Sequence, residues 1–127
     1  MSKSNRYIFD TNTAIELLSE KISFVDLGID SQSYIIIPGV VYLELLSKDF
    51  SPEKLINIQN FLNKFEVSEA GLHEYIVAAK LRRENKGLKT PDSIVVATAL
   101  TKQAVLVTGD TLLLKIEGLK TVDINNL

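Results

Sequence analysis

The stretch Tyr7-Ile8-Phe9-Asp10-Thr11-Asn12 decides how the rest of the chain can be arranged. It is a short apolar run that stops at an acid followed by two small polar residues, which is typical of a buried strand that delivers a carboxylate to its end. In an open α/β sheet, ligands bind just beyond the carboxyl ends of the parallel strands. Asp10 therefore stands where a functional site would be built.

Helix-like and strand-like segments alternate along the rest of the chain. Apolar residues at helical spacing predict a helix over Thr11 to Ser19, then a second short helix or a helical loop over Lys21 to Ile29. The β-branched run Tyr34 to Ile37, closed by Pro38, is typical of a buried parallel strand. Further helices are predicted over 39–46, 52–62, 72–85, 90–100 and 111–116, and further strands over 65–67, 104–108 and 121–124.

Two details of these helices are also predicted. Thr90 precedes Pro91 and is expected to cap the helix that begins there, because proline is favoured at the first helical position. The helix over 72–85 is expected to be amphipathic, with Tyr75, Ile76, Ala79 and Leu81 among its apolar residues.

The alternation of elements predicts an α/β fold. Five strands with helices between them give a doubly wound, Rossmann-like three-layer α/β/α sandwich, in which a five-stranded, mostly parallel sheet is covered on both faces. With 127 residues, 46% hydrophobic and 24% charged, the chain has the size and composition of one folded domain. We therefore expect a single domain over residues 1–127.

Composition excludes several classes of protein. There is no cysteine, so disulfides and thiolate chemistry are excluded. The longest apolar runs fall short of the roughly 18 residues that a membrane span needs, and no signal-peptide pattern opens the chain. A cytoplasmic protein is expected. The net charge of −2 argues against coating of nucleic acid by bulk positive charge, but four acids committed to a metal would leave the remainder net positive.

Four acids carry the chemistry. Asp10 and Asp110 lie between a predicted strand and helix, and Asp92 lies in the first turn of a helix, so each also has a structural explanation as a cap. Glu44 sits among apolar residues and would be costly to bury unpaired. All four could meet at the carboxyl edge of the sheet, where their repulsion would demand protons or cations. Oxygen ligands without histidine or cysteine point to Mg²⁺ or Mn²⁺.

Four ordered stretches of the chain resemble the PIN-domain family. They are 9–12, the helix that contains Glu44, 90–99 and 107–110, and their length and spacing are similar to those of its VapC-type toxins. The resemblance implies a metal-dependent endoribonuclease, typically the toxin of a bacterial or archaeal toxin–antitoxin pair. It also implies a homodimer and a cognate antitoxin as partners.

The resemblance implies roles for particular residues. Carried over by position, the metal-binding and catalytic quartet is Asp10, Glu44, Asp92 and Asp110, with Thr108 and Asn12 as supporting polar residues. Some relatives have a further acid just after the last one, where this chain has Thr111 to Leu114, which argues against a second tightly held metal. The expected reaction is hydrolysis of an RNA phosphodiester by a metal-activated water, without a side-chain nucleophile.

Two groups of residues have both a binding and a structural interpretation. A basic run just before Asp92 consists of Lys80, Arg82, Arg83, Lys86 and Lys89. It either contacts RNA phosphates, chiefly through Arg82, Arg83 and Lys86, or is a solvated helix end favoured by the helix dipole. Apolar residues on the early helices either form an antitoxin groove or dimer face, or are simply core: Ile15, Leu18, Ile22, Phe24 and Val25.

Two other functions are compatible with the sequence. One is a phosphoryl-transfer domain of receiver or dehalogenase type, although Asp10 lacks the adjacent acid of receivers and Asn12 replaces the second aspartate of dehalogenases. The other is a non-catalytic RNA-binding or partner-binding module that keeps the metal site as structure.

Overall fold

The computed structural model describes residues 5–127 and contains one five-stranded sheet. The strands are β1 (Arg6–Phe9), β2 (Tyr34–Pro38), β3 (Glu66–Ser68), β4 (Val105–Thr108) and β5 (Thr121–Asp123). Their spatial order is β3-β2-β1-β4-β5, and every neighbouring pair is parallel. The expected mostly parallel sheet is therefore parallel throughout.

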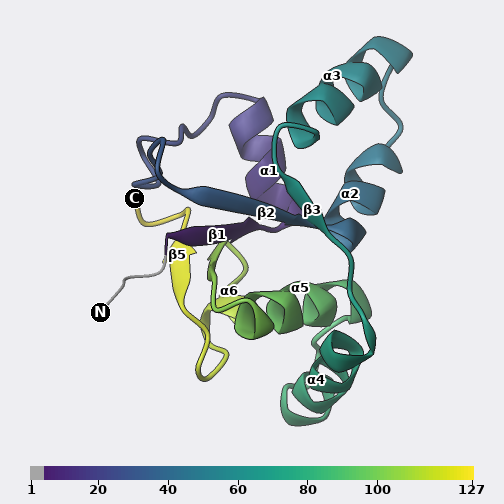
Figure 1. Ribbon diagram of the computed structural model, residues 1–127, viewed down its shortest axis with the longest axis vertical. Coiled ribbons are helices and arrows are strands. Elements are labelled where there is room, and N and C mark those ends of the chain that lie inside the picture. The colour runs from purple at the N-terminus through teal and green to yellow at the C-terminus, as the bar shows by residue number, and fades with distance from the viewer. Residues whose placement is uncertain (1–4) are drawn as a thin grey trace.

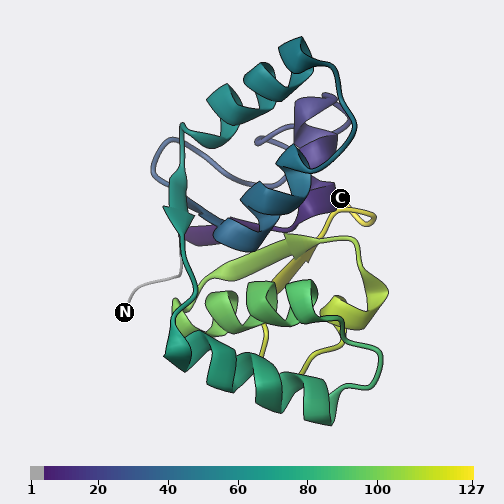
Figure 2. The ribbon, with the colours of Figure 1, turned by 90° about the vertical axis from the view of Figure 1, so that its right-hand side faces the viewer.

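In the described part of the chain, six helices cover the two faces of the sheet; Figures 1 and 2 show their arrangement. The helices α1 (Thr11–Leu18), α2 (Gly39–Leu46) and α3 (Pro52–Leu62) lie on one side. On the other side lie α4 (Leu72–Glu84), α5 (Thr90–Thr101) and α6 (Thr111–Leu114). In Figure 2, α5 lies between α4 and the sheet, so α4 is the outer helix on this side. The predicted three-layer α/β/α sandwich is confirmed.

The core explains why the sheet occupies the centre. Ile8, Phe9, Ile37, Leu106 and Val107 are fully buried on β1, β2 and β4, the three inner strands. Strands covered on both faces need such continuous apolar runs, whereas edge strands do not. The outer strands β3 and β5 are accordingly short, at three residues each, and more exposed.

The strand order separates two of the interpretations left open by the sequence. The order 3-2-1-4-5 is that of the first five strands of the Rossmann arrangement, whereas receiver domains have the order 2-1-3-4-5. The receiver alternative is therefore wrong for this chain.

The structure decides between two alternatives and corrects two local predictions. Of the second short helix or helical loop expected over 21–29, it contains the loop, a series of turns in which Gly28 has a positive φ of 74°. The cap of α5 is Lys89 rather than Thr90, which is the first helical residue. On α4, which packs against α5, the buried residues are Ala78 and Leu81, whereas Tyr75 and Ile76 are exposed.

Among residues 5–127, no helix is both long enough and apolar enough to cross a membrane.

Candidate active site

The candidate site lies where the sheet changes winding direction. β1 pairs with β2 on one side and with β4 on the other, so the crossovers that leave β1 and β4 run to opposite faces. Ligands of open α/β sheets bind outside the carboxyl ends of the strands at this switch point. Asp10 directly follows β1, and Asp110 follows β4 by two residues. Both acids are thus delivered to the place where the fold leaves a crevice.

Asp10 is held by hydrogen bonds on both of its oxygens. Oδ1 accepts from the backbone N–H of Thr13 at 2.9 Å and so caps α1. Oδ2 accepts from the hydroxyl of Thr108 at 2.5 Å, across the boundary between β1 and β4. Asp10 is only 7% exposed, and Thr108 is fully buried. The carboxylate therefore has a fixed orientation, and the prediction that Thr108 supports the acid is consistent with this contact.

Thr108 also links Asp10 to Asp110. Its Oγ1 accepts from the backbone N–H of Asp110 at 3.0 Å while its hydroxyl proton goes to Asp10. Asp110 uses Oδ1 to cap α6, where it accepts from Leu112 N–H at 2.8 Å. One buried hydroxyl thus couples two of the four acids.

Gly109 lets the chain pass from Thr108 to Asp110 without a clash. A Cβ at position 109 would lie 2.8 Å from Nδ2 of Asn125 and 2.9 Å from Cγ1 of Ile124, closer than such atoms approach. Only glycine therefore fits between the two polar residues with the surrounding structure unchanged.

Glu44 reaches the same edge from α2. Its Oε1 accepts from the hydroxyl of Thr11 at 2.6 Å, and Thr11 is the residue next to Asp10. Glu44 is half-buried rather than fully exposed. Its position inside an apolar helix thus matches the expectation that it needs a polar partner.

Asp92 lies in the first turn of α5, where its pKa reflects the other three acids. Desolvation by burial raises the pKa of Asp92 above its ordinary value of 3.8, and the charges of Asp110, Glu44 and Asp10 raise it further. Lys89 acts in the opposite direction and lowers it. Since charge interactions of this kind weaken with distance, the four predicted acids form one electrostatic cluster.

The donor set fits a hard divalent cation, although its oxygens are not gathered around one point. Among residues 5–127, no three acidic or histidine side chains converge as the ligands of a metal do. The oxygens named above are engaged instead in capping and hydroxyl hydrogen bonds. Clustered carboxylates without a cation repel one another, whereas Mg²⁺ and Mn²⁺ prefer this all-oxygen set. The four acids therefore fit a divalent cation by the type of their ligand atoms and by their negative charge.

Repulsion within the cluster predicts a pH dependence of stability. The raised pKa of Asp92 means that its ionised form costs free energy in the folded state. This cost is absent well below pH 3.8, where Asp92 is protonated in both states. It grows as pH rises from 3.8 to the raised folded-state pKa, and it is constant above that pKa. We expect Asp92→Asn to stabilise the metal-free protein at pH 7, and the gain to disappear on acidification.

Urea unfolding in EDTA at pH 7 and below pH 4 measures this effect. The matched control is Asp49→Asn, which changes the same charge on an exposed residue between α2 and α3. A variant at Asp92 that is less stable than the wild type at pH 7 would contradict the prediction.

Two threonines of the site were not predicted from sequence. Thr11 holds Glu44, and fully buried Thr13 donates its hydroxyl to the carbonyl of Val107 at 2.7 Å, which ties α1 to β4. Asn12, which was predicted, lies exposed in the first turn of α1. The signal in the sequence was Thr-Asn-Thr directly after the acid, but threonine after a strand is too common to single out.

The structure also shows how exposed the basic run before Asp92 and the apolar residues of the early helices are. Arg82, Arg83 and Lys86 are all exposed around the end of α4. Of the early apolar residues, only Val25 is largely exposed, at 85%, while the others pack against the core. An exposed apolar strip occurs instead on α4, at Leu72, Tyr75 and Ile76.

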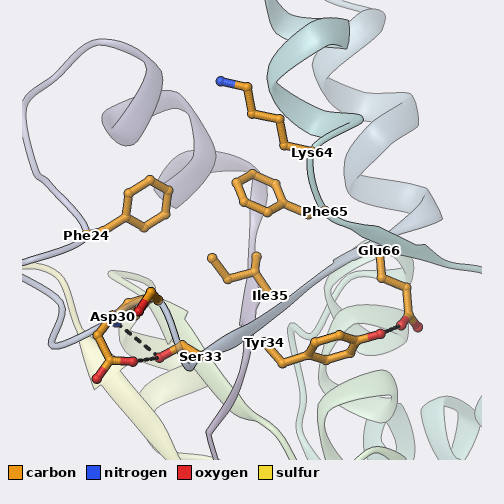
Figure 3. Close-up of a pocket in the computed structure, with 10 residues that line it drawn as sticks. Phe24, Asp30, Ser33, Tyr34, Ile35, Lys64, Phe65 and Glu66 are labelled. Atoms are coloured by element: carbon orange, nitrogen blue, oxygen red, sulfur yellow. Dashed lines mark hydrogen bonds between the residues drawn. The ribbon is translucent and has the colours of Figure 1, made fainter.

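A separate cavity lies at the opposite edge of the sheet (Figure 3). It has a volume of about 510 Å³, and Phe24, Tyr34 and Phe65 contribute aromatic side chains to its lining. At its rim the hydroxyl of Tyr34 donates to Glu66, and this bond raises the pKa of Tyr34. None of the four acids lines this cavity. It is therefore not part of the candidate active site.

Comparison with known proteins identifies a family and several structures of similar fold. A family model of the PIN domain matches residues 7–119. No curated protein matches the chain in sequence. The fold is similar to that of VapBC2 from Rickettsia felis bound to a promoter DNA fragment, with 20% identity, a TM-score of 0.79 and coverage of 93% of this chain and 98% of that one.

Two further structures are similar at comparable coverage. A toxin–antitoxin complex from Klebsiella pneumoniae has 24% identity and a TM-score of 0.77, covering 91% of this chain and 95% of that one. PAE2754 from Pyrobaculum aerophilum has 19% identity and a TM-score of 0.67, covering 92% and 83% respectively. Because the PIN-domain model spans almost the whole chain, including all four acids, the chain belongs to the PIN-domain family.

Proposed function

We propose that this chain is a metal-dependent endoribonuclease that hydrolyses RNA phosphodiester bonds. The observation that carries the proposal is the electrostatic cluster of Asp10, Glu44, Asp92 and Asp110 at the switch point of the sheet. Membership of the PIN-domain family supports it. A cluster of acids that costs stability without a cation is expected where the cation is needed for chemistry.

The residues of the cluster have distinct roles in this proposal. These carboxylates would hold a divalent ion, which would supply activation of a water and charge neutralisation at the phosphate. Asp10 is the best-oriented ligand, because both of its oxygens are fixed by hydrogen bonds. Glu44, Asp92 and Asp110 complete the oxygen set, and Thr11 and Thr108 orient two of the acids. His73 is an exposed residue of α4, and the proposal gives it no role in proton transfer.

Cleavage of a total RNA pool tests the proposal. We expect discrete fragments with Mg²⁺ or Mn²⁺, no cleavage in EDTA, and no cleavage of single-stranded DNA under the same conditions. Absence of cleavage in every metal, with metal binding still measurable by calorimetry, would favour the non-catalytic binding module. A stable acyl-phosphate on Asp10 after treatment with a small phosphodonor would favour the dehalogenase-type alternative.

We also propose that the chain is the toxin of a toxin–antitoxin pair and acts in the cytoplasm, where its RNA substrate lies. Support comes from the structures similar in fold, which include a complex named as toxin–antitoxin and several named as VapBC. Induced expression in a bacterial host is expected to arrest growth, and the Asp10→Asn variant is expected not to do so. Equal growth arrest by both proteins would contradict this role.

The proposed homodimer is supported by the exposed apolar strip on α4. Ile76 is 61% exposed there beside Leu72 and Tyr75, and contiguous apolar surface of this kind marks interaction sites. We expect Ile76→Glu to convert the dimer to a monomer in light scattering at micromolar concentration. Ile56→Glu, on an equally exposed isoleucine of α3, is the matched control and should leave the mass unchanged. A wild-type monomer would contradict the dimer.

A further inference from the structure

A cleft with positively charged walls lies where α4 turns into α5. The α4–α5 cleft has a volume of about 500 Å³ and is lined by Ala79, Arg82, Arg83, Gly87, Leu88 and Lys89. Figure 2 shows this turn at the same end of the molecule as α6, whose first turn follows Asp110. The cleft is therefore a neighbour of the acidic cluster and separate from it.

The cations of the cleft are not engaged in close ion pairs within residues 5–127. Within residues 5–127, the only ion pairs closer than 4 Å are Lys80 with Glu84 and Lys102 with Glu66. Arg82, Arg83 and Lys89 thus have no carboxylate within that distance in this part of the chain. Three cations around one concave surface attract an anion more strongly than the same cations spread over a flat surface.

One of the three cations is fixed in position. The Nε of Arg82 donates to the carbonyl of Leu88 at 3.1 Å, a bond that does not use the donors on the terminal nitrogens of the guanidinium. Leu88 is buried, and Gly87 takes a positive φ of 88°, which turns the chain into place. Arginine held in this way is suited to binding the oxygens of a phosphate.

Helix stability does not account for Lys89. Arg82 and Arg83 are in the last turn of α4, where cations are favourable for the helix dipole. Lys89, however, is the N-cap of α5, where a cation is unfavourable and where its side chain makes no capping hydrogen bond. The lysine at this position is therefore not explained by stabilisation of the helix. Lys89 also stands three positions before Asp92, at the start of the same helix.

We propose that the α4–α5 cleft binds a backbone phosphate of the RNA, next to the phosphate that is cut at the acidic cluster. Arg82 and Arg83 contact this phosphate from α4, and Lys89 contacts it from the start of α5. Lys80 and Lys86, the other two residues of the predicted basic run, are exposed but do not line the cleft. The inference rests on the proposed function and locates its substrate on the protein surface.

The test is RNA binding in EDTA, where no cleavage interferes. A fluorescent single-stranded RNA of about 12 nucleotides is titrated with the wild type and with Arg83→Gln/Lys89→Gln at several salt concentrations. Arg82 is left intact because its hydrogen bond to Leu88 is structural. We expect affinity to fall about tenfold and the slope of log K against log salt to decrease by about 0.7, the value for one phosphate contact on a single strand.

Matched controls separate a local from a global charge effect. Lys21→Gln/Lys48→Gln removes the same charge from exposed residues outside the cleft and should change affinity less than twofold. Thermal melts establish that each variant is folded. An equal loss of affinity in both double variants, or no loss in the cleft variant, overturns the inference.

Two further results separate this inference from its alternatives. Adenosine 5′-monophosphate is titrated in parallel, and binding that depends on the cleft while RNA affinity does not would assign the cleft to a free phosphate ester and overturn the RNA assignment. Because binding is measured without metal, its outcome is independent of cleavage. Cleft-dependent RNA binding by a protein that cuts nothing supports the cleft and contradicts only the proposed nuclease function.

Discussion

Asp10→Asn is expected to reduce the rate of RNA cleavage by about 10²–10³-fold, which corresponds to a loss of several kcal/mol of metal-dependent stabilisation of the transition state. The substitution removes the charge of the most firmly oriented acid of the cluster. Its effect on the fold should be small, since asparagine is as good an N-cap as aspartate. The side-chain oxygen can still accept from Thr13 N–H, the contact that caps α1 in the wild type.

The measurement is a cleavage time course with saturating Mg²⁺ or Mn²⁺, paired with a thermal melt of the same samples. The control is Asp26→Asn, since Asp26 also accepts a backbone N–H through its carboxylate, from Ser23 at 2.9 Å, but lies in the loop after α1. We expect the control to cleave at the wild-type rate. Retention of more than about a tenth of the activity by Asp10→Asn would remove this acid from the catalytic group.

Phe9→Ala is expected to cost about 3–5 kcal/mol of unfolding free energy, because it empties a fully buried aromatic site. Phe9 packs against Phe24 at 6.2 Å and Phe65 at 6.4 Å between ring centroids, so it joins β1 to the loop after α1 and to the start of β3. For a domain of this size the loss lowers the melting temperature by about 10–20 °C. Since Phe9 immediately precedes Asp10, the same change loosens the end of the strand that presents the acid.

Urea denaturation of Phe9→Ala beside Phe50→Ala measures this effect. Phe50 is a partly exposed ring beneath the ammonium of Lys54, at 4.1 Å from the ring centroid. Its removal should cost about 1 kcal/mol, as substitutions outside a tight core usually do. A smaller loss at Phe9 than at Phe50 would show that the aromatic cluster is not a main support of the sheet.

The sequence was sufficient for the elements and for the edge at which the acids meet. Strands that are buried on both faces must be apolar throughout, and an acid at the end of such a run marks the end of the strand, as Asp10 does after Phe9. Local capping rules also placed Asp10 and Asp110 at helix starts. The apolar pattern of a strand and the capping of a helix each involve only a few neighbouring residues, so both can be recognised without knowledge of tertiary contacts.

Features that depend on packing between distant segments were not accessible in this way. The pattern on α4 did not indicate which of its apolar residues face α5, and Tyr75 and Ile76 are exposed although the sequence grouped them with Leu81. The hydroxyl of Thr108 reaches Asp10 across 98 positions of sequence, and that of Thr11 reaches Glu44 across 33. No local rule predicts such pairs.

By itself the sequence determined the fold class and the order of its elements, and it singled out four acids as candidate ligands of a hard divalent cation. Only the tertiary structure decided that Thr11 and Thr108 form hydrogen bonds with three of those residues, and that Arg82, Arg83 and Lys89 share one cleft. The physical reason is the distance along the chain over which each interaction acts. Hydrophobic periodicity and capping act over one or two helical turns, whereas hydrogen bonds and charges act between side chains that only the folded backbone brings together.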